Sequence, residues 1–352
     1  MTARNPYTIG FGKIPTEYIS RNTILDSITE ALTGDVPDEQ AFKLTGMRGT
    51  GKTVTLTAIE KRFRKDKDFI VLDLNCGGDL LTDLVSLLYS EVPSLTRYID
   101  ANLNLTAFGI GVSVSRKSPV TSVRTALNKL LTEIKKQKKH LLILIDEVRK
   151  TKGLVELIQE FQIWIRSDLP VFLVVAGLYE DIEAIENSDG ITFFLRAAKY
   201  EMTPLNIAYI RDNYVKNLSI DTGEAERLAL MTKGYAFAYQ VLGKYMWDAK
   251  AKKLSDAVLS QFDETLSEKV YQKIWSELSE KDRYFLSFIV KKENLPVSEL
   301  LDAAKQGHSA WSVPRKRLKD KGIIDVSRRG IVSMRLPRFG CFLETQMLME
   351  RF

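Results

Sequence analysis

The sequence predicts a parallel α/β core that is followed by an all-helical segment and then by three helices and a β-hairpin. Three observations lead to this fold class. Over residues 1–205, apolar runs of strand length alternate with amphipathic helical stretches; residues 206–262 show helical patterns alone; and over residues 263–352 three short helical stretches precede two strand-like pieces. These three ranges are the expected domains.

Four near-continuous apolar runs predict the strands of the core, because parallel strands covered by helices on both faces are apolar throughout. They are Ala41–Thr45, Phe69–Leu74, Leu141–Ile145 and Val171–Ala176. Between them, Thr53–Arg64 and Ser122–Lys136 carry apolar residues at helical spacing and predict crossover helices. Leu103–Val114 alternates with period two around two glycines, so we expect an inserted hairpin there.

The rest of the chain changes pattern twice. From Asn206 to about Phe262 we expect helices, with Gly234 as a break between two of them. The last segment is predicted to hold the helices Glu277–Val290, Val297–Lys305 and Ser312–Lys321, then the strands Ile323–Ser327 and Ile331–Leu336 around a turn at Arg328–Gly330. Three helices followed by a hairpin are typical of a winged helix.

Composition excludes several classes of protein. With 352 residues, 45% hydrophobic and 27% charged, the chain is neither disordered throughout nor fibrous. Its longest apolar runs are too short to cross a bilayer, and its first residues do not form a signal peptide. Two cysteines and two histidines give no disulfide framework and nearly exclude a Cys/His metal site. We therefore expect a cytoplasmic protein without a membrane partner.

The segment Gly46–Thr53 (GMRGTGKT) matches the phosphate-binding loop pattern GxxxxGK[ST]. Its glycines let successive backbone N–H groups turn toward phosphate oxygens, Lys52 would reach the β- and γ-phosphates, and the Thr53 hydroxyl would bind Mg²⁺. A plain glycine-rich turn is the alternative, but the loop follows a predicted strand and opens a predicted helix. The expected nucleotide contacts are Gly46, Gly49, Thr50, Gly51, Lys52, Thr53 and Val54.

A second element supports this interpretation. The apolar strand that begins at Leu141 ends in two carboxylates, Asp146 and Glu147. Such a strand can bring Asp146 to Mg²⁺ and Glu147 to a water in line with the γ-phosphate. The alternative is a strand that merely ends in exposed acids. Beside the glycine-rich loop, the pair predicts a site for a nucleoside triphosphate in which water is activated.

These segments resemble a known family. The loop, the strand LLILIDE, the strand VFLVVAG and the segment FFLRAAKYEMTPL resemble the ATPase core of AAA+ proteins. More closely, they resemble bacterial ATP-binding proteins related to archaeal origin-recognition initiators and STAND signalling ATPases. GYAFAYQVLGKYMW is similar to the helical lid of that family and the C-terminus to its winged helix, so the resemblance spans nearly the whole chain.

The resemblance implies ATP as nucleotide, Mg²⁺ as cofactor and ATP hydrolysis as activity. It implies that Tyr18, Ile19 and Arg21 lie near the adenine, and that Arg196 reaches a phosphate in cis or on a neighbouring subunit. The alternative for Arg196 is a surface arginine, or one paired with Glu201 or a lid carboxylate.

Two departures from the family pattern limit the expected rate. Ala176 and Gly177 stand where the family often has a polar sensor residue. The segment Gly234–Ala236 has neither the lid arginine nor the Gly-x-Pro turn of the family. With Glu147 present and these groups lacking, we expect slow hydrolysis and a switch-like role.

Positive charge is concentrated in the C-terminal fifth. Of the net charge of +6, the last 72 residues carry 15 Lys/Arg against 8 Asp/Glu, and the rest of the chain 36 against 37. We expect Ser312 to cap a helix with Pro314 in its first turn and with Pro314 and Leu318 facing inward. The expected contacts with double-stranded DNA are Arg315, Lys316, Lys319, Arg328 and Arg329.

Other functions stay open at this stage. Winged helices also dock onto proteins, so the alternative is a STAND-like signalling scaffold in which the nucleotide acts as a latch. A homo-oligomer is compatible with either. A small-molecule kinase is disfavoured by the acidic pair, which suits the activation of water.

Overall fold

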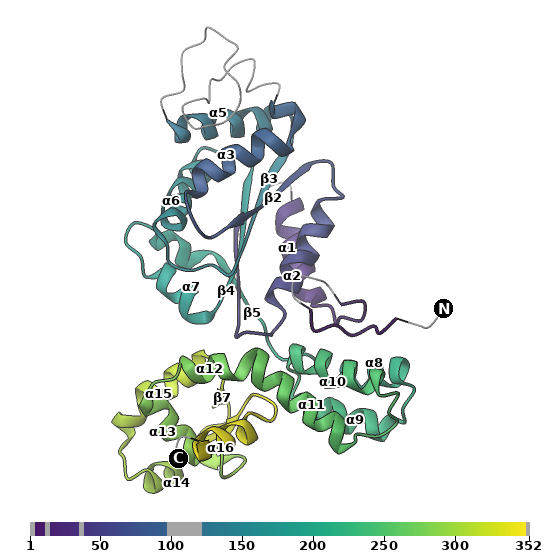
Figure 1. Ribbon diagram of the computed structural model, residues 1–352. Helices are drawn as coiled ribbons and strands as arrows, with labels where there is room; N and C mark the ends of the chain where they lie inside the picture. The colour runs from purple at the N-terminus through teal and green to yellow at the C-terminus, as the bar shows by residue number, and fades with distance from the viewer. Residues whose placement is uncertain (1–3, 11–14, 35–38, 97–121, 350–352) are drawn as a thin grey trace. The chain divides into compact units, whose positions relative to one another are not determined.

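The computed structural model describes residues 4–10, 15–34, 39–96 and 122–349 (Figure 1). The chain forms two compact units. One, here called the sheet unit, comprises the described residues of Arg21–Thr45 and Lys52–Glu201. The other, here called the helical unit, comprises the described residues up to Ser20, Gly46–Gly51 and the chain from Met202 onward. The expected hairpin at Leu103–Val114 lies outside the described residues.

The sheet unit is built on five parallel strands in the order β2-β3-β4-β1-β5. The strands are β1 (Ala41–Thr45), β2 (Phe69–Asn75), β3 (His140–Asp146), β4 (Val171–Gly177) and β5 (Ala198–Glu201). The four apolar runs singled out in the sequence are β1 to β4, which confirms the predicted parallel sheet. β5 was not predicted; it pairs with β1, with Phe42 opposite Ala198.

Helices cover both faces of this sheet. α3 (Leu80–Glu91), α5 (Val123–Lys136) and α6 (Lys152–Arg166) lie on one face, and α1 (Asn22–Thr33) and α2 (Lys52–Phe63) on the other (Figure 1). Leu141, Ile143 and Ile145 of β3 pack into the cluster under α3, α5 and α6, and the residues between them point to the opposite face, since side chains alternate along a strand. α7 (Tyr179–Glu186) and the 3₁₀ turn η2 (Thr192–Arg196) connect β4 to β5.

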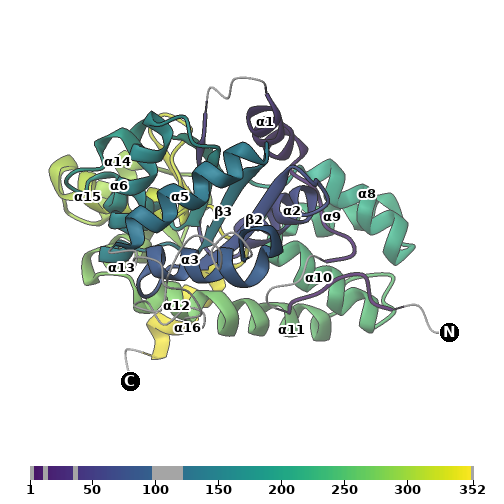
Figure 2. The same cartoon turned by 90° about the horizontal axis from the view of Figure 1, so that it is seen from above.

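From Met202 onward, the helical unit first forms α8 (Ile207–Leu218), α9 (Thr222–Met231), α10 (Ala236–Asp248) and α11 (Asp256–Leu266). α8 and α9 lie side by side (Figure 2). Asn206, Asp221 and Ser255 cap three of them through side-chain oxygens. Gly234 separates α9 from α10 at φ +73°, which confirms the expected break. α11 continues through the π turn η3 (Ser267–Tyr271) into α12 (Gln272–Ser276).

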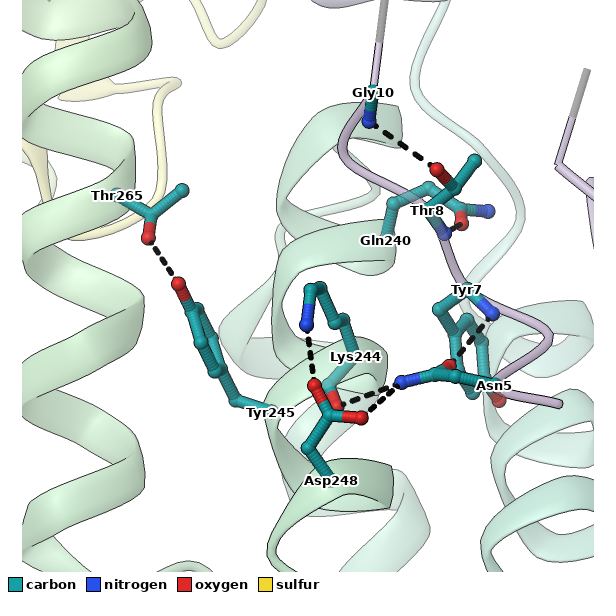
Figure 3. A network of polar contacts seen from close by, with 9 residues as sticks. All are labelled: Asn5, Tyr7, Thr8, Gly10, Gln240, Lys244, Tyr245, Asp248 and Thr265. Atoms are coloured by element: carbon teal, nitrogen blue, oxygen red, sulfur yellow. Dashed lines mark hydrogen bonds and ion pairs between the residues drawn. The ribbon is translucent and has the colours of Figure 1, made fainter. Parts of the chain in front are cut away.

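The N-terminal residues are fastened to α10 (Figure 3). The Asn5 side-chain amide donates to the Lys244 carbonyl at 3.2 Å, and the Thr8 N–H donates to Gln240 Oε1 at 3.0 Å. The Tyr7 ring packs against Gly243, where a Cβ atom would lie 2.6 Å from it. Tyr7 is therefore part of the same hydrophobic core as α10, and Ile9 packs against that core.

The C-terminal elements combine short helices with a small antiparallel sheet. In chain order they are α13 (Glu280–Ile289), β6 (Leu295–Pro296), α14 (Val297–Ala303), α15 (His308–Asp320), β7 (Ile324–Asp325), β8 (Ile331–Met334) and α16 (Phe339–Met349). The sheet order is β6-β8-β7, with β8 antiparallel to both neighbours. The sequence did not predict β6 or α16.

The expected start of α15 was wrong. The helix begins at His308, behind Gly307, and Ser312 does not cap it, because its hydroxyl donates to the Ser309 carbonyl at 2.9 Å within the helix. Pro314 consequently lies inside the helix, where its missing N–H removes one backbone hydrogen bond. The expected inward face is confirmed, since Pro314 and Leu318 are both buried.

No helix in the described ranges is long and apolar enough to cross a membrane.

Candidate functional site

The Thr53 hydroxyl and the Asp146 carboxylate meet in the sheet unit. Thr53 lies in the first turn of α2 and Asp146 is the last residue of β3. Thr53 Oγ1 donates to Asp146 Oδ2 at 2.6 Å, although 93 residues separate the two in sequence. The two side chains that the sequence assigned to a magnesium ion are therefore brought together, and both are half-buried.

Glu147 follows Asp146 in a left-handed backbone conformation, with φ +49°. Its N–H donates to Asp146 Oδ1 at 2.8 Å, and its own side chain is exposed. The next residue, Val148, donates its N–H to the Ala176 carbonyl at 2.9 Å. The turn after β3 is thus fixed to the end of β4, and the Glu147 carboxylate is held outside the strand.

The end of β4 has no space for a side chain. Gly177 is buried, and a Cβ atom there would lie 2.8 Å from Val148 Cγ2 and 3.3 Å from the Val148 carbonyl oxygen. The lack of a polar side chain at this position, noted in the sequence, therefore matches the packing. A polar residue here would displace the turn that carries Glu147.

The loop Gly46–Gly51 belongs to the helical unit and leads directly into Lys52, the first residue of α2. Gly49 and Gly51 have φ values of +73° and +93°, which favour glycine. The Thr50 hydroxyl donates to the Met47 carbonyl at 2.9 Å and closes the turn. Lys52 and Val54 are half-buried in the first turn of α2.

The start of α10 contacts this loop, which sequence reasoning missed. The Tyr235 hydroxyl donates to the Arg48 carbonyl at 2.7 Å, and the Phe237 N–H donates to the Gly49 carbonyl at 3.0 Å. The Arg48 guanidinium also forms an ion pair with Glu277 at 3.3 Å. No sequence motif marks these contacts, because nearly 190 residues separate Arg48 from Tyr235 along the chain.

The three residues expected near the adenine are divided between the units. Tyr18 and Ile19 belong to the helical unit, where the Tyr18 hydroxyl donates to Ser20 Oγ at 3.2 Å and Ile19 packs against the core. Arg21 belongs to the sheet unit and is the residue before α1. Burial lowers the pKa of its guanidinium below the ordinary value.

Arg196 is the last residue of η2 and is exposed. Lys43 of β1 stabilises the turn that carries Arg196, because its Nζ donates to the Phe194 carbonyl at 2.7 Å. The same ammonium forms an ion pair with Glu186 at 2.7 Å. The sequence did not predict this supporting role of Lys43, since a lysine inside a strand is not a recognisable signal.

The donor atoms present fit a magnesium–nucleotide complex. Mg²⁺ takes oxygen ligands and is commonly held by one or two protein groups together with phosphate oxygens. Thr53 Oγ1 and Asp146 Oδ2 are such groups and already lie at contact distance from one another. Groups of three or more His, Cys, Asp or Glu that could form an all-protein metal site are absent from the described residues.

The basic residues expected to contact DNA are exposed. Arg315, Lys316 and Lys319 lie on α15, and Arg328 and Arg329 lie in the turn between β7 and β8. Lys316 forms an ion pair with Asp320 at 3.3 Å on the same helix.

Comparisons with known proteins place this geometry in a wider context. Residues 268–343 match the family described as Domain of unknown function (DUF8462). No curated protein matches the chain. Among solved structures, the chain is similar to the Walker-type ATPase PABY2304 of Pyrococcus abyssi, with 15% identity and a TM-score of 0.61 over 94% of this chain and 96% of the other.

The chain is also similar to the ORC2 protein of Aeropyrum pernix, solved in ADPNP and ADP complexes. That match has 14% identity and a TM-score of 0.56, and it covers 97% of each chain. The core has the AAA+ fold. At these identities the likeness concerns the fold, and the AAA+ core with its parallel sheet and its helical C-terminal region is as predicted from the sequence.

Proposed function

We propose that the protein binds ATP with Mg²⁺, hydrolyses it slowly, and uses the bound nucleotide to control DNA binding by a C-terminal winged helix. The observation that carries the nucleotide site is the 2.6 Å hydrogen bond between Thr53 and Asp146, because it joins the two motifs that were recognised separately in the sequence. The similar Aeropyrum pernix structure is described as a complex with ADPNP and ADP, which is consistent with this assignment.

Each residue of the nucleotide site has a distinct role in this proposal. Lys52 binds the β- and γ-phosphates, Thr53 and Asp146 hold the metal, and Glu147 orients the attacking water. The metal ion, when bound, neutralises charge on the β- and γ-phosphates. Glu147 is proposed to accept a proton from that water; its carboxylate is exposed, and the Val148 N–H bond to the Ala176 carbonyl holds the turn that carries it.

Slow turnover follows from what the site lacks. Gly177 has no side chain at the end of β4, so this position cannot help to orient the water or to stabilise charge on the γ-phosphate. The start of α10 supplies no arginine, and its Tyr235 hydroxyl and Phe237 N–H are neutral groups that already donate to carbonyls of the loop. Arg196 is exposed and is proposed to reach a phosphate either in the same chain or in a neighbouring copy.

The nucleotide proposal is tested by two variants. Lys52→Ala should abolish MgATP binding measured by isothermal titration calorimetry, and retention of micromolar binding would contradict the loop assignment. Glu147→Gln should bind MgATP with the affinity of the unmodified chain and release no phosphate. Turnover that persists in Glu147→Gln would show that another residue activates the water.

We interpret residues 263–352 as the winged helix, residues 206–262 as the lid and residues 1–205 as the nucleotide-binding core. The order α13, β6, α14, α15, β7, β8 supports the first assignment. In this interpretation α15 enters the major groove and the turn between β7 and β8 lies along the phosphate backbone. The concentration of exposed basic residues on these two elements supports DNA as the partner.

The DNA proposal is tested with Arg315→Ala combined with Arg328→Ala, and Arg317→Ala is the matched control. Arg317 is anchored by Asp282 at 2.8 Å and by Ser279 at 2.9 Å, so its guanidinium serves the fold. Duplex affinity measured by fluorescence anisotropy should fall in the double variant and should decrease steeply with salt in the unmodified chain. Unchanged affinity would favour the signalling alternative, in which this domain docks onto a protein.

Control by the nucleotide requires that one arrangement of the chain binds ATP better than another, because a ligand shifts only equilibria in which it has a preference. Mass measurement in solution with ATP, with ADP and without nucleotide, each with and without a short duplex, reports assembly and DNA capture together. Equal DNA affinity in all three nucleotide states would remove the switch from the proposal.

A further inference from the structure

Two residues at the start of α10 donate hydrogen bonds to the carbonyls of two consecutive residues of the phosphate loop. The Tyr235 hydroxyl donates to the carbonyl of Arg48 at 2.7 Å, and the Phe237 N–H donates to the carbonyl of Gly49 at 3.0 Å. Both donors come from the start of α10, and the loop and α10 belong to the same compact unit.

Fixing these carbonyls also fixes the amides that follow them. In a trans peptide the C=O of one residue and the N–H of the next point in opposite directions. With the Arg48 carbonyl bound to Tyr235, the Gly49 N–H is directed away from α10. With the Gly49 carbonyl bound to Phe237, the Thr50 N–H is likewise directed away. Two successive amides of the phosphate loop thus have a defined direction before any ligand arrives.

Tyr235 is itself rigidly placed. Its N–H donates to the Thr232 carbonyl at 2.8 Å, and the preceding Gly234 carbonyl accepts from the Leu205 N–H at 2.8 Å. The residue is 6% exposed, and burial raises the pKa of its hydroxyl, so the hydroxyl stays protonated and able to donate near neutral pH.

Gly49 fits this arrangement for a second reason besides its backbone conformation. A Cβ atom at Gly49 would lie 2.1 Å from the Tyr235 hydroxyl oxygen, whereas a Cβ atom at Gly51 would meet only Ala236, at 3.9 Å. The loop and the tyrosine therefore have complementary shapes at one glycine, because a side chain there would overlap the Tyr235 hydroxyl.

We propose that Tyr235 is a positioning residue for nucleotide binding, which aligns the Gly49 and Thr50 amides of the phosphate loop toward the phosphates. This inference rests on the proposed function, because it assumes that the loop binds a nucleotide. In this proposal, Tyr235 contributes to the affinity for the nucleotide although it lies outside the phosphate-binding motif. Because an aligned loop contacts ground state and transition state alike, Tyr235 should affect binding and leave the chemical step unchanged.

The test is Tyr235→Phe, which removes the hydroxyl and retains the ring. Tyr245→Phe is the matched control, because its hydroxyl also forms a single 2.8 Å hydrogen bond from α10, to Thr265 on α11 (Figure 3). Loss of one hydrogen bond corresponds to about a fivefold change in an equilibrium constant. We expect the Kd for MgATP and the KM for ATP to rise about fivefold in Tyr235→Phe with kcat unchanged. Tyr245→Phe should match the unmodified chain.

A second pair of variants tests the other hydrogen bond. Phe237→Pro removes the N–H donor at the second position of α10, in the first turn, where proline is tolerated. Phe237→Ala removes the same side chain and keeps the N–H. We expect weaker MgATP binding in Phe237→Pro than in Phe237→Ala, so the inference can be tested even if Tyr235→Phe folds poorly.

The outcomes separate this inference from the proposed function. If the unmodified chain does not bind MgATP, or if Lys52→Ala binds it equally well, both proposals fail. If the unmodified chain binds MgATP and Lys52→Ala does not, the loop assignment holds. In that case, equal Kd values for Tyr235→Phe and Tyr245→Phe, together with equal values for Phe237→Pro and Phe237→Ala, would overturn the positioning role alone. A drop in kcat without a change in KM would overturn it as well.

Discussion

Two lysine–glutamate ion pairs of identical length offer a direct test of how burial determines the stability of this fold. Lys43 Nζ lies 2.7 Å from Glu186 in the sheet unit, and Lys292 Nζ lies 2.7 Å from Glu299 in the helical unit. The side chains of the first pair are 1% and 10% exposed, and those of the second pair are 53% and 52% exposed. Lys43→Met and Lys292→Met each remove one lysine charge that lies 2.7 Å from a glutamate, and the two sites differ chiefly in burial.

The expected magnitudes follow from that difference. Removing one partner of a buried pair costs about 3–5 kcal/mol, because the other charge stays buried without its partner. Lys43→Met also deprives the Phe194 carbonyl of its 2.7 Å hydrogen bond, but Lys199 remains 3.7 Å from Glu186 and offsets part of the loss. We expect a loss of about 3 kcal/mol for Lys43→Met. For Lys292→Met we expect less than about 1 kcal/mol, as for exposed pairs in general.

Urea unfolding with 5-fluorotryptophan-labelled protein can resolve the two units by ¹⁹F NMR. Trp164 is the only tryptophan of the sheet unit, and Trp247, Trp275 and Trp311 lie in the helical unit. Lys43→Met should lower the unfolding midpoint reported by Trp164, and adding Glu186→Leu should restore part of it because no charge then remains buried. Similar losses for Lys43→Met and Lys292→Met would refute the argument from burial.

Two further predictions concern the helical unit. Both Gly49→Ala and Gly51→Ala place a side chain at positive φ, at a cost of about 1 kcal/mol, but Gly49→Ala also forces a methyl group against the Tyr235 hydroxyl. Without nucleotide, Gly49→Ala should therefore lower the thermal midpoint more than Gly51→Ala in differential scanning fluorimetry, and equal shifts would contradict the contact. The Arg227 guanidinium donates two hydrogen bonds to the Glu224 carboxylate and lowers its pKa below the ordinary value of 4.5. A carboxyl with a lowered folded-state pKa stabilises the fold above its unfolded pKa and loses this contribution as pH falls through the folded pKa. Glu224→Gln should thus flatten the decline in urea midpoint between about pH 5 and pH 3, and parallel declines would argue against it.

The core strands could be predicted because a strand that is buried on both faces appears in the sequence as a continuous apolar run. Each residue of β4 is buried, and the run that forms it is apolar throughout. The sequence of β5 has no such apolar run. Its four residues alternate between half-buried and exposed, two of them are charged, and the strand exists through pairing with β1, more than 150 residues earlier. Edge strands of this kind depend on a partner that local sequence does not reveal.

The start of α15 was also predicted wrongly because it depends on a contact that is distant in sequence. Proline is usual in the first turn of a helix, so Pro314 placed the expected start at Ser312. The actual start at His308 follows Gly307, which offers no capping side chain. Trp311, four residues before Arg315, is buried against Phe285 of α13, with ring centroids 4.9 Å apart. Packing of this first turn against α13 stabilises the longer helix, and no local signal announces that contact.

At the proposed nucleotide site, the meeting of Thr53 with Asp146 could be predicted from the sequence, and the hydrogen bonds that support the loop could not. Thr53 and Asp146 belong to motifs whose residue types follow from phosphate and magnesium chemistry, so each could be recognised alone. Tyr235 donates to a backbone carbonyl, and any side chain at Arg48 would present the same group. A contact with backbone atoms places no demand on the partner's identity, which explains why the sequence contained no sign of it.

A count of basic residues in the C-terminal region exceeds the number that are available to bind DNA, because some of them form ion pairs within the fold. Residues 315–338 contain nine Lys/Arg, yet Arg317 is bound to Asp282 and Arg338 to Asp263, and both pairs connect elements of the fold. Lys316 forms an ion pair with Asp320 on the same helix. Each phosphate contact adds about 0.9 to the slope of log affinity against log salt concentration. Phosphate contacts from the other four residues of the proposed interface, Arg315, Lys319, Arg328 and Arg329, would give a slope of about 3.6. A protein with so few phosphate contacts would bind non-specific DNA weakly at physiological salt, so the proposed control by nucleotide would need to change only a modest affinity to switch DNA occupancy.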